Sequence, residues 1–117
     1  MPVSKLKKLR EIAQENRSPA ETMAGWVERY ATYLRSECHL AENTVQAYRR
    51  DLTHMGEWLQ GRSPTRMGVR ELSEFGGSLK QRQLAASSIS RHIVAVRMFY
   101  TFLQLENAVQ DNPAELL

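Results

Sequence analysis

The stretch LAENTVQAYRRDLTHMGEWL, residues Leu40 to Leu59, decides the fold class of this 117-residue chain. Its apolar residues recur three or four positions apart, which is the spacing that lines one face of an α-helix. They are Val45, Tyr48, Leu52, Met55 and Leu59. We therefore predict an amphipathic helix that begins near Glu42 and continues to about Gln60, where Gly61 supplies a stop signal.

Apolar residues at helical spacing also precede this stretch. A helix is predicted from about Glu21 to Cys38, with an apolar stripe of Trp26, Tyr30, Tyr33 and Leu34. The segment KLKKLREIAQEN, residues Lys5 to Asn16, predicts a shorter amphipathic helix that has cations on its polar side. Such a segment is either a solvated terminal helix or a basic arm that touches DNA or a protein partner.

Two more helices are predicted after a loop marked by Gly61 to Gly68. The first runs from about Val69 to Gln83 and is expected to bend or break at Gly76-Gly77, because each glycine in a helix interior costs roughly 1 kcal/mol relative to alanine. The second opens at Ser87 or Ser88, which are both good caps. Its apolar stripe is Ile89, Ile93, Val96, Tyr100 and Leu103. With no alternating strand pattern, the sequence predicts an all-α fold, a compact bundle of four helices with an additional short N-terminal helix.

The charge distribution points to an acidic partner. The length fits one domain, and 16 Lys and Arg against 13 Asp and Glu give a net charge of +3. Between Phe75 and Leu105 there is no Asp or Glu, whereas four cations fall in this stretch: Lys80, Arg82, Arg91 and Arg97. A local excess of one sign on one element is typical of a phosphate-binding surface.

The polar face of the predicted Glu42–Gln60 helix is the first candidate for DNA binding. Opposite the apolar stripe lie Gln46, Arg49, Arg50 and Thr53, with Asn43 and Thr44 in the first turn. A major groove about 12 Å wide accepts one α-helix, in which Arg pairs with guanine and Gln or Asn pairs with adenine. The alternative is a solvated face, since Asp51 and Glu57 partly neutralise this helix.

The last predicted helix is a second, independent candidate for DNA binding. Ser87, Ser88 and Arg91 share its first turns, Arg97 lies further along, and no acid offsets them. The simplest role of Ser87 is that of a helix cap. Arg91 points the same way as Ser88, from where it is able to reach a base edge or a phosphate.

No catalytic, cofactor or metal site is predicted, nor a small-molecule substrate or a membrane span. His39, His54 and His92 lack metal-ligand spacing and are expected to be surface or boundary histidines. Cys38 is alone, which excludes an intrachain disulfide, suits a reducing cytoplasm and indicates a buried or half-buried bystander. The aromatic residues mostly fall on the apolar stripes, so core packing is expected rather than stacking on single-stranded nucleic acid.

Several segments together resemble a known family. Residues Leu40 to Leu59 are similar to the signature helix of the core-binding, SAM-like N-terminal domain of phage-integrase and Xer-type tyrosine recombinases. The segment ASSISRHIVAVRMFYTFL, residues Ala86 to Leu103, resembles a later helix of that domain, and DNPAELL, residues Asp111 to Leu117, resembles its exit into the catalytic domain. With YATYLRSECHL, residues Tyr30 to Leu40, the resemblance covers most of the chain from about Thr22 onward.

The resemblance implies an orthogonal helical bundle that forms half of a clamp around duplex DNA at a recombination core site. Two helices would cross in the major groove, and the domain would contact neighbouring recombinase protomers. The DNA-facing residues that it implies are Asn43, Thr44, Gln46, Arg49 and Arg50 on one helix and Ser87, Ser88, Arg91 and Arg97 on the other. Catalysis would belong to a domain beyond Leu117. The expected parts are a basic extension (1–20), a core-binding domain (21–110) and the start of a linker (111–117), without enzymatic activity of their own.

Two alternatives remain open: a helical protein–protein interaction domain whose basic face is only solvated, and a stand-alone helix-turn-helix regulator. Alanine at Arg50 and Arg91 discriminates among them. A DNA-binding role predicts weaker duplex binding and a shallower salt dependence, because phosphate contacts release counterions. The stability of the fold is expected to stay almost unchanged in that variant.

Overall fold

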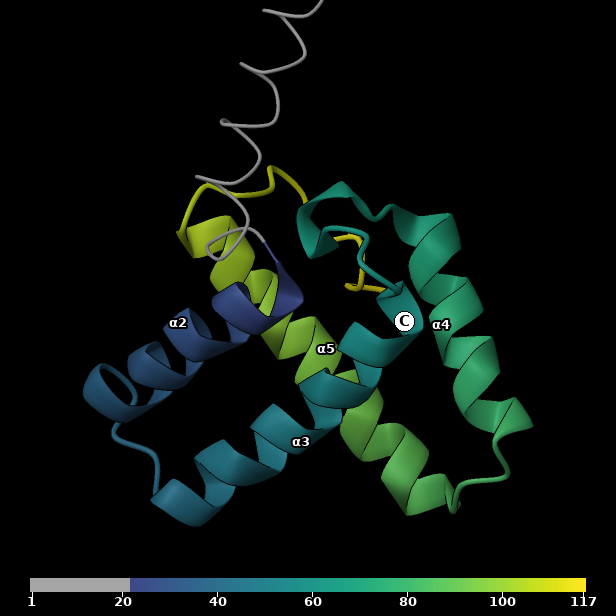
Figure 1. Cartoon of the computed structure of the whole chain (residues 1–117), viewed down its shortest axis with the longest axis horizontal. Helices are drawn as coiled ribbons and strands as arrows, with labels where there is room; N and C mark the ends of the chain where they lie inside the picture. The colour runs from purple at the N-terminus through teal and green to yellow at the C-terminus, as the bar shows by residue number, and fades with distance from the viewer. Residues whose placement is uncertain (1–21) are drawn as a thin grey trace, which may run out of the picture.

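The computed structural model describes residues 22–117, and the regular elements in this part of the chain are all helical (Figure 1). Their bounds are α2 Met23–Ser36, α3 Glu42–Leu59, the 3-10 helix η1 Pro64–Arg66, α4 Val69–Gln81 and α5 Ala86–Leu105. The predicted all-α bundle of four helices is therefore confirmed. The helix predicted at Lys5 to Asn16, and the basic extension as a whole, lie outside the described residues. None of the helices in 22–117 is both long and apolar enough to cross a membrane.

The helices are arranged around a crossing of α3 and α5. Helices α2 and α3 run antiparallel and pack together, α5 crosses α3 near the middle of the molecule, and α4 packs against α5 (Figure 1). The first turns of α3 and α5 lie at the same, lower edge of Figure 1, whereas α4 begins at the upper edge. Two helix N-termini from distant parts of the sequence thus share one side of the molecule.

The predicted apolar stripes meet in one core. Four members of the α3 stripe are at most 1% exposed, namely Val45, Leu52, Met55 and Leu59. The ring of Tyr30 in α2 contacts those of Phe99 and Phe102 in α5, with centroids 5.6 and 5.1 Å away. The buried hydroxyl of Tyr100 donates a hydrogen bond to the Pro64 carbonyl at 2.6 Å, which ties η1 to α5. Core packing is confirmed for these aromatic residues.

Helix α2 is shorter at both ends than the predicted Glu21 to Cys38. Thr22 caps its start, because its Oγ1 accepts a hydrogen bond from the Gly25 N–H at 3.2 Å. The helix ends at Ser36, and the following turn passes through His39, whose φ is 54°. Cys38 lies in this turn and is exposed, so the expected buried or half-buried thiol is wrong. The helix stops before it can carry that side chain to the core.

Helix α4 is continuous through Gly76 and Gly77, so the predicted break does not occur. Leu72, Phe75 and Leu79 are buried on one side of the helix and hold both halves against the core. Their burial outweighs the weak helix propensity of the glycines, because tertiary packing supplies most helical stability in proteins. The helix ends at Gln81, before the predicted Gln83, which has a left-handed φ of 57°.

Helix α5 begins at Ala86, one or two residues before the predicted start at Ser87 or Ser88. Ala85 is the capping residue, with extended backbone angles and no side-chain hydrogen bond to the helix. Ser87 and Ser88 are therefore the second and third residues of the helix, and the expectation that one of them is the cap is wrong. The backbone is already helical at Ala86, so both hydroxyls stand within the first turn.

The last residues fold back along α5. The side-chain amide of Asn112 donates to the Arg97 carbonyl and to Thr101 Oγ1, both at 3.3 Å. Its oxygen accepts a hydrogen bond from the Ala114 N–H at 2.9 Å, and Ala114 is fully buried. Asn112 thus fixes this segment to the outer side of α5.

Candidate nucleic-acid interface

The first turns of α3 and α5 lie at one edge of the bundle (Figure 1). The first N–H groups of a helix have no acceptor within the helix and carry a partial positive charge, which favours phosphate binding. Four predicted site residues stand in these turns: Asn43, Thr44 and Ser87, which are exposed, and Ser88, which is half-buried. The first turn of α5 contains no acid, and that of α3 contains only Glu42.

The Glu42 carboxylate is neutralised by a neighbouring arginine. Arg35 at the end of α2 donates Nε to Oε2 and Nη2 to Oε1, both at 2.8 Å. These hydrogen bonds, together with one from Gln46 Nε2 at 2.8 Å, lower the pKa of Glu42 to about 2. Glu42 therefore stays ionised, but the positive charge of Arg35 offsets its negative charge at the first turn of α3. It also holds the side chain of Gln46, a predicted base-reading residue.

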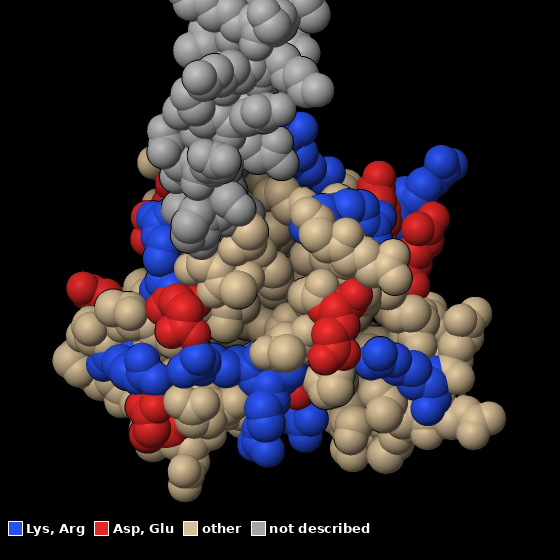
Figure 2. Space-filling view, in the orientation of Figure 1, with Lys and Arg blue, Asp and Glu red and all other residues tan. Residues whose placement is uncertain are grey.

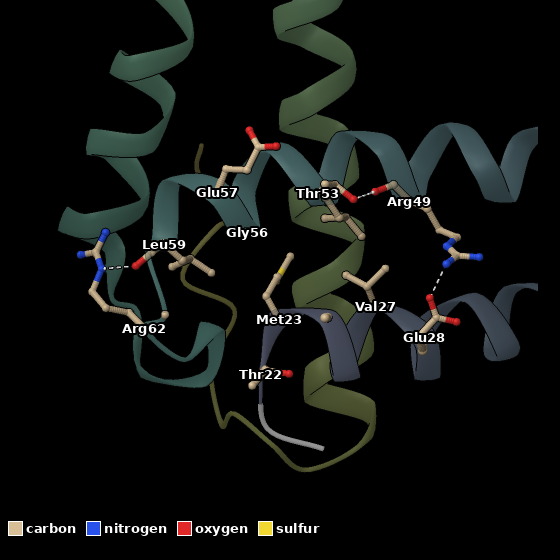
Figure 3. Close-up of a pocket in the computed structure, with 13 residues that line it drawn as sticks. Thr22, Met23, Val27, Glu28, Arg49, Thr53, Gly56, Glu57, Leu59 and Arg62 are labelled. Atoms are coloured by element: carbon tan, nitrogen blue, oxygen red, sulfur yellow. Dashed lines mark hydrogen bonds and ion pairs between the residues drawn. The ribbon is translucent and has the colours of Figure 1, made fainter. Parts of the chain in front are cut away.

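Arg49 turns away from the edge toward α2. It forms an ion pair with Glu28, as Figure 3 shows, and its carbonyl accepts a hydrogen bond from the Thr53 hydroxyl at 2.8 Å. The pair lies at the rim of a groove of about 560 Å³ between α2 and α3. Arg49 is thus half-buried and paired with Glu28, whereas its sequence neighbour Arg50 is exposed.

Arg50 is an exposed cation on α3. Its side chain has no hydrogen-bond or ion-pair partner among residues 22–117. A guanidinium without an internal partner loses no protein contact when it binds a phosphate or a guanine. Of the predicted α3 residues, Arg50 is therefore the cation that is free to bind a ligand.

Asp51 is not part of the solvated face to which it was assigned. Its side chain is 2% exposed, and it accepts hydrogen bonds from Arg91 Nε and Nη2, both at 2.9 Å. The pair joins the middle of α3 to the second turn of α5 at their crossing. Arg91 nevertheless remains 56% exposed. The sequence suggested that Asp51 offsets part of the positive charge on the polar face of α3. In the structure, Asp51 is instead buried and paired with Arg91.

His92 is buried, which corrects the expected surface or boundary position. Its ring is 4% exposed, and its Nδ1 lies 3.7 Å from Asp51 Oδ1 without a hydrogen-bond partner. The ring contacts that of His54, with centroids 5.3 Å apart. Burial lowers the pKa of His92 from its ordinary value, against the attraction of Asp51. In 22–117, no three His, Cys, Asp or Glu side chains are grouped so that they could hold a metal ion.

The lowered pKa of His92 predicts a pH-dependent stability. The unfolded chain takes up the proton near pH 6.5, whereas the folded protein takes it up only at lower pH. Between these two pKa values the unfolded state binds more protons, so the free energy of unfolding falls as the pH falls below about 6.5. Urea unfolding at several pH values between about 7.5 and 5.5 measures this slope. In His92→Leu the slope should be smaller, and parallel slopes in the two proteins would contradict the assignment.

Further exposed cations lie around the two helices. Figure 2 shows Lys and Arg side chains in a band across the lower half of this face, interrupted by single carboxylates. Lys80 and Arg82, at the end of α4, are exposed and precede the start of α5 by a few residues. Arg97 is exposed too, but it lies about a third of a turn around the axis of α5 from Arg91. It stands beside Asn112, away from the crossing.

The structure therefore brings together part of the predicted site. The first-turn polar residues share one edge of the bundle, Arg50 is exposed, and Arg91 is held by Asp51 at the crossing. Arg49 instead pairs with Glu28 on α2, and Arg97 stands beside Asn112. Asp51 was missed as a member of the site. Its position next to Leu52, four residues before Met55, was the available signal, because that position borders the apolar stripe.

The comparisons with known proteins identify a family for this chain. Residues 27–107 match the family model of the phage integrase N-terminal SAM-like domain. The chain is 35% identical over 92 residues to tyrosine recombinase XerC of Roseiflexus castenholzii, a match that covers 76% of this chain and 29% of the relative. It is 31% identical over 96 residues to XerC of Listeria innocua (79% and 32%), and 29% identical over 92 residues to XerD of Oceanobacillus iheyensis (75% and 31%). No solved structure matches it significantly.

The chain belongs to the family of phage-integrase N-terminal SAM-like domains. It is an N-terminal domain of the kind found in Xer-type tyrosine recombinases, and the resemblance stated from its sequence is confirmed. The chain spans about a third of the length of the recombinases that it matches.

Proposed function

We propose that this domain binds duplex DNA, with α3 and α5 crossing in the major groove at a recombination core site. The observation that carries the proposal is the shared position of the two helix N-termini at one edge of the bundle (Figure 1). Hydroxyl side chains stand in both first turns and the Asn43 amide in that of α3, while Arg91 lies about one turn and Arg50 about two turns further along their helices with exposed guanidinium groups. This combination suits phosphate and base contacts from a pair of helices.

The predicted residues would take different roles in this complex. Thr44, Ser87 and Ser88 would bind phosphates together with the N–H groups of their first turns. Asn43, Gln46 and Arg50 would reach base edges or phosphates, which are the groups that amides and guanidinium groups recognise. Arg49 would have to leave Glu28, and Arg97 lies on another side of α5, so we assign both to flanking phosphates at most.

We infer that the whole protein is a tyrosine recombinase, as the relatives are by name. The breaking and rejoining of DNA would then belong to a catalytic domain outside the third of the relatives that this chain matches. Recombinase protomers would contact one another through the N-terminal domain as well. On α5, the apolar side chains of Val94 and Met98 are 44% and 38% exposed, and a protomer contact would bury them.

Alanine at Arg50 tests DNA binding without disturbing the core. Arg50→Ala is expected to weaken binding to a mixed-sequence duplex and to reduce the slope of log K against log salt by about 0.9 for one lost phosphate contact. Its melting temperature should not change, since Arg50 has no partner in the described part of the chain. Fluorescence anisotropy at several salt concentrations, starting at low salt, measures both quantities.

Arg70→Ala is the matched control, because it removes the same charge from an exposed position in the first turn of α4. That turn lies at the opposite edge of the bundle (Figure 1). The control should keep most of the affinity. Equal losses in the two variants would show a non-specific charge effect, and an intact domain without duplex affinity at low salt would favour a protein–protein interaction domain instead.

A further inference from the structure

We propose that Asp51 is a positioning residue for DNA binding, which holds the Arg91 guanidinium so that its free N–H groups face a backbone phosphate above the crossing of α3 and α5. This inference rests on the proposed function. It names the ligand of Arg91 as a phosphate and gives Asp51 a role beyond joining two helices.

The ion pair with Asp51 leaves three of the five N–H donors of the Arg91 guanidinium available to a ligand. An arginine carries five N–H donors in a planar fork. Asp51 accepts from Nε and from Nη2, both at 2.9 Å, so Nη1 and the second hydrogen of Nη2 have no partner among residues 22–117. The carboxylate is 2% exposed whereas the Arg91 side chain is 56% exposed. One edge of the fork is therefore fixed in the protein, and the other edge faces solvent.

The surroundings of Asp51 support positioning rather than simple stabilisation. Burial of the Asp51 carboxylate has a desolvation cost, which its pair with the half-exposed Arg91 must offset, so the pair is weak evidence of stabilisation. Here a carboxylate stands at a helix crossing, beside a buried histidine whose Nδ1 has no hydrogen-bond partner. The arrangement does fix a long side chain in one conformation. A guanidinium held in this way loses less conformational entropy when it binds a phosphate.

The effect of Asp51→Asn on DNA affinity distinguishes a positioning role of Asp51 from a role that only joins α3 to α5. Asp51→Asn removes a negative charge from the proposed DNA-binding edge. If Asp51 only joins α3 to α5, this variant, once folded, should bind duplex DNA as well as the parent or more tightly, because repulsion between carboxylate and phosphates is lost. If Asp51 positions Arg91, binding should weaken in spite of the more favourable net charge.

We therefore expect folded Asp51→Asn to bind a mixed-sequence DNA duplex on the order of fivefold more weakly than the parent. Arg91→Lys, which keeps the charge but not the fork, should lose a similar factor. The double variant should be no weaker than Arg91→Lys alone, because both changes remove the same contact. Affinity is measured by anisotropy on the full chain, below the melting temperature of each variant.

Glu106→Gln is the matched control, since it neutralises the exposed carboxylate that pairs with Arg29 Nη2 at 3.3 Å at the far end of α5. It should bind DNA at least as well as the parent. Unchanged or tighter binding by folded Asp51→Asn overturns the proposal, as do losses that simply add in the double variant. If Asp51→Asn does not fold, undiminished binding by Arg91→Lys overturns it instead. Weakening by Arg50→Ala alone would leave the proposed function intact, whereas no weakening by any of these variants would refute both.

Discussion

The double variant Thr44→Glu/Ser87→Glu is expected to bind duplex DNA on the order of 100-fold more weakly than the parent while its stability stays the same or rises. Both residues are exposed and lie in the first turns of α3 and α5. At those positions the new carboxylates would face the phosphates that the two helix N-termini are proposed to bind. Like charges placed against each other in an interface cost several kcal/mol.

The effect on stability has the opposite sign. A negative charge in the first turn of a helix interacts favourably with the helix dipole, typically by 0.3–1 kcal/mol. The first turn of α5 has no acid of its own, so Ser87→Glu should gain most of this contribution. Loss of affinity in a protein that melts at the same or a higher temperature would thus locate the defect in the interface.

Thr44→Gln/Ser87→Gln is the matched control, because glutamine has nearly the size of glutamate without its charge. This variant should lose far less affinity. Anisotropy titrations on one duplex at one low salt concentration compare the three proteins, and thermal unfolding checks their folds. Affinity retained by the glutamate variant would exclude the shared edge of α3 and α5 as the DNA-binding surface.

Phe99→Ala is expected to lower the free energy of unfolding by about 3–5 kcal/mol. Phe99 is fully buried, and its ring packs against those of Tyr30 and Tyr100 at 5.6 and 5.7 Å between centroids. Alanine would remove apolar contacts and leave a cavity where α2 and α5 meet. Because domains of this size are typically stable by only about 5–15 kcal/mol, much of the total would be lost.

Val94→Ala, one and a half turns earlier on α5, is the control for this truncation. Val94 is 44% exposed, so its loss should cost no more than about 0.5 kcal/mol. Guanidinium unfolding of both variants and the parent gives the two differences. A cost below about 1 kcal/mol for Phe99→Ala would mean that the aromatic residues of α5 are not the centre of the core.

Helix positions in the described chain could largely be read from the sequence, and helix ends could not. The stripe from Val45 to Leu59 identified α3 to within a residue, because apolar periodicity and the stop at Gly61 agree. The ends of α2 and α4 were placed too far along the chain. Gly76-Gly77 failed to break α4, since the burial of Phe75 and its neighbours exceeds a local propensity.

For the candidate site too, the sequence predicted positions along a helix but not contacts between helices. Periodicity placed Arg49 and Arg50 on the polar side of α3, and both are there. It could not show that Arg49 turns to Glu28 on α2 while Arg50 stays unpaired, because the partner belongs to another helix. The charge distribution likewise identified Arg91 as a candidate, and alanine at this position was expected to leave the stability of the fold almost unchanged. The structure shows that this change would also leave Asp51 buried without its partner.

The sequence by itself determined that this is an all-α domain of the recombinase N-terminal type, because helical periodicity and family resemblance are properties of short contiguous segments. Only the tertiary structure decided which polar groups meet. Asp51 and Arg91 are 40 residues apart in sequence, and His92 is buried beside them. The crossing of α3 and α5 creates these contacts, since apolar packing brings the helices together and a charged group that is buried at the crossing must then be paired. That crossing also sets the first turns of both helices at one edge, where the proposed DNA-binding surface lies.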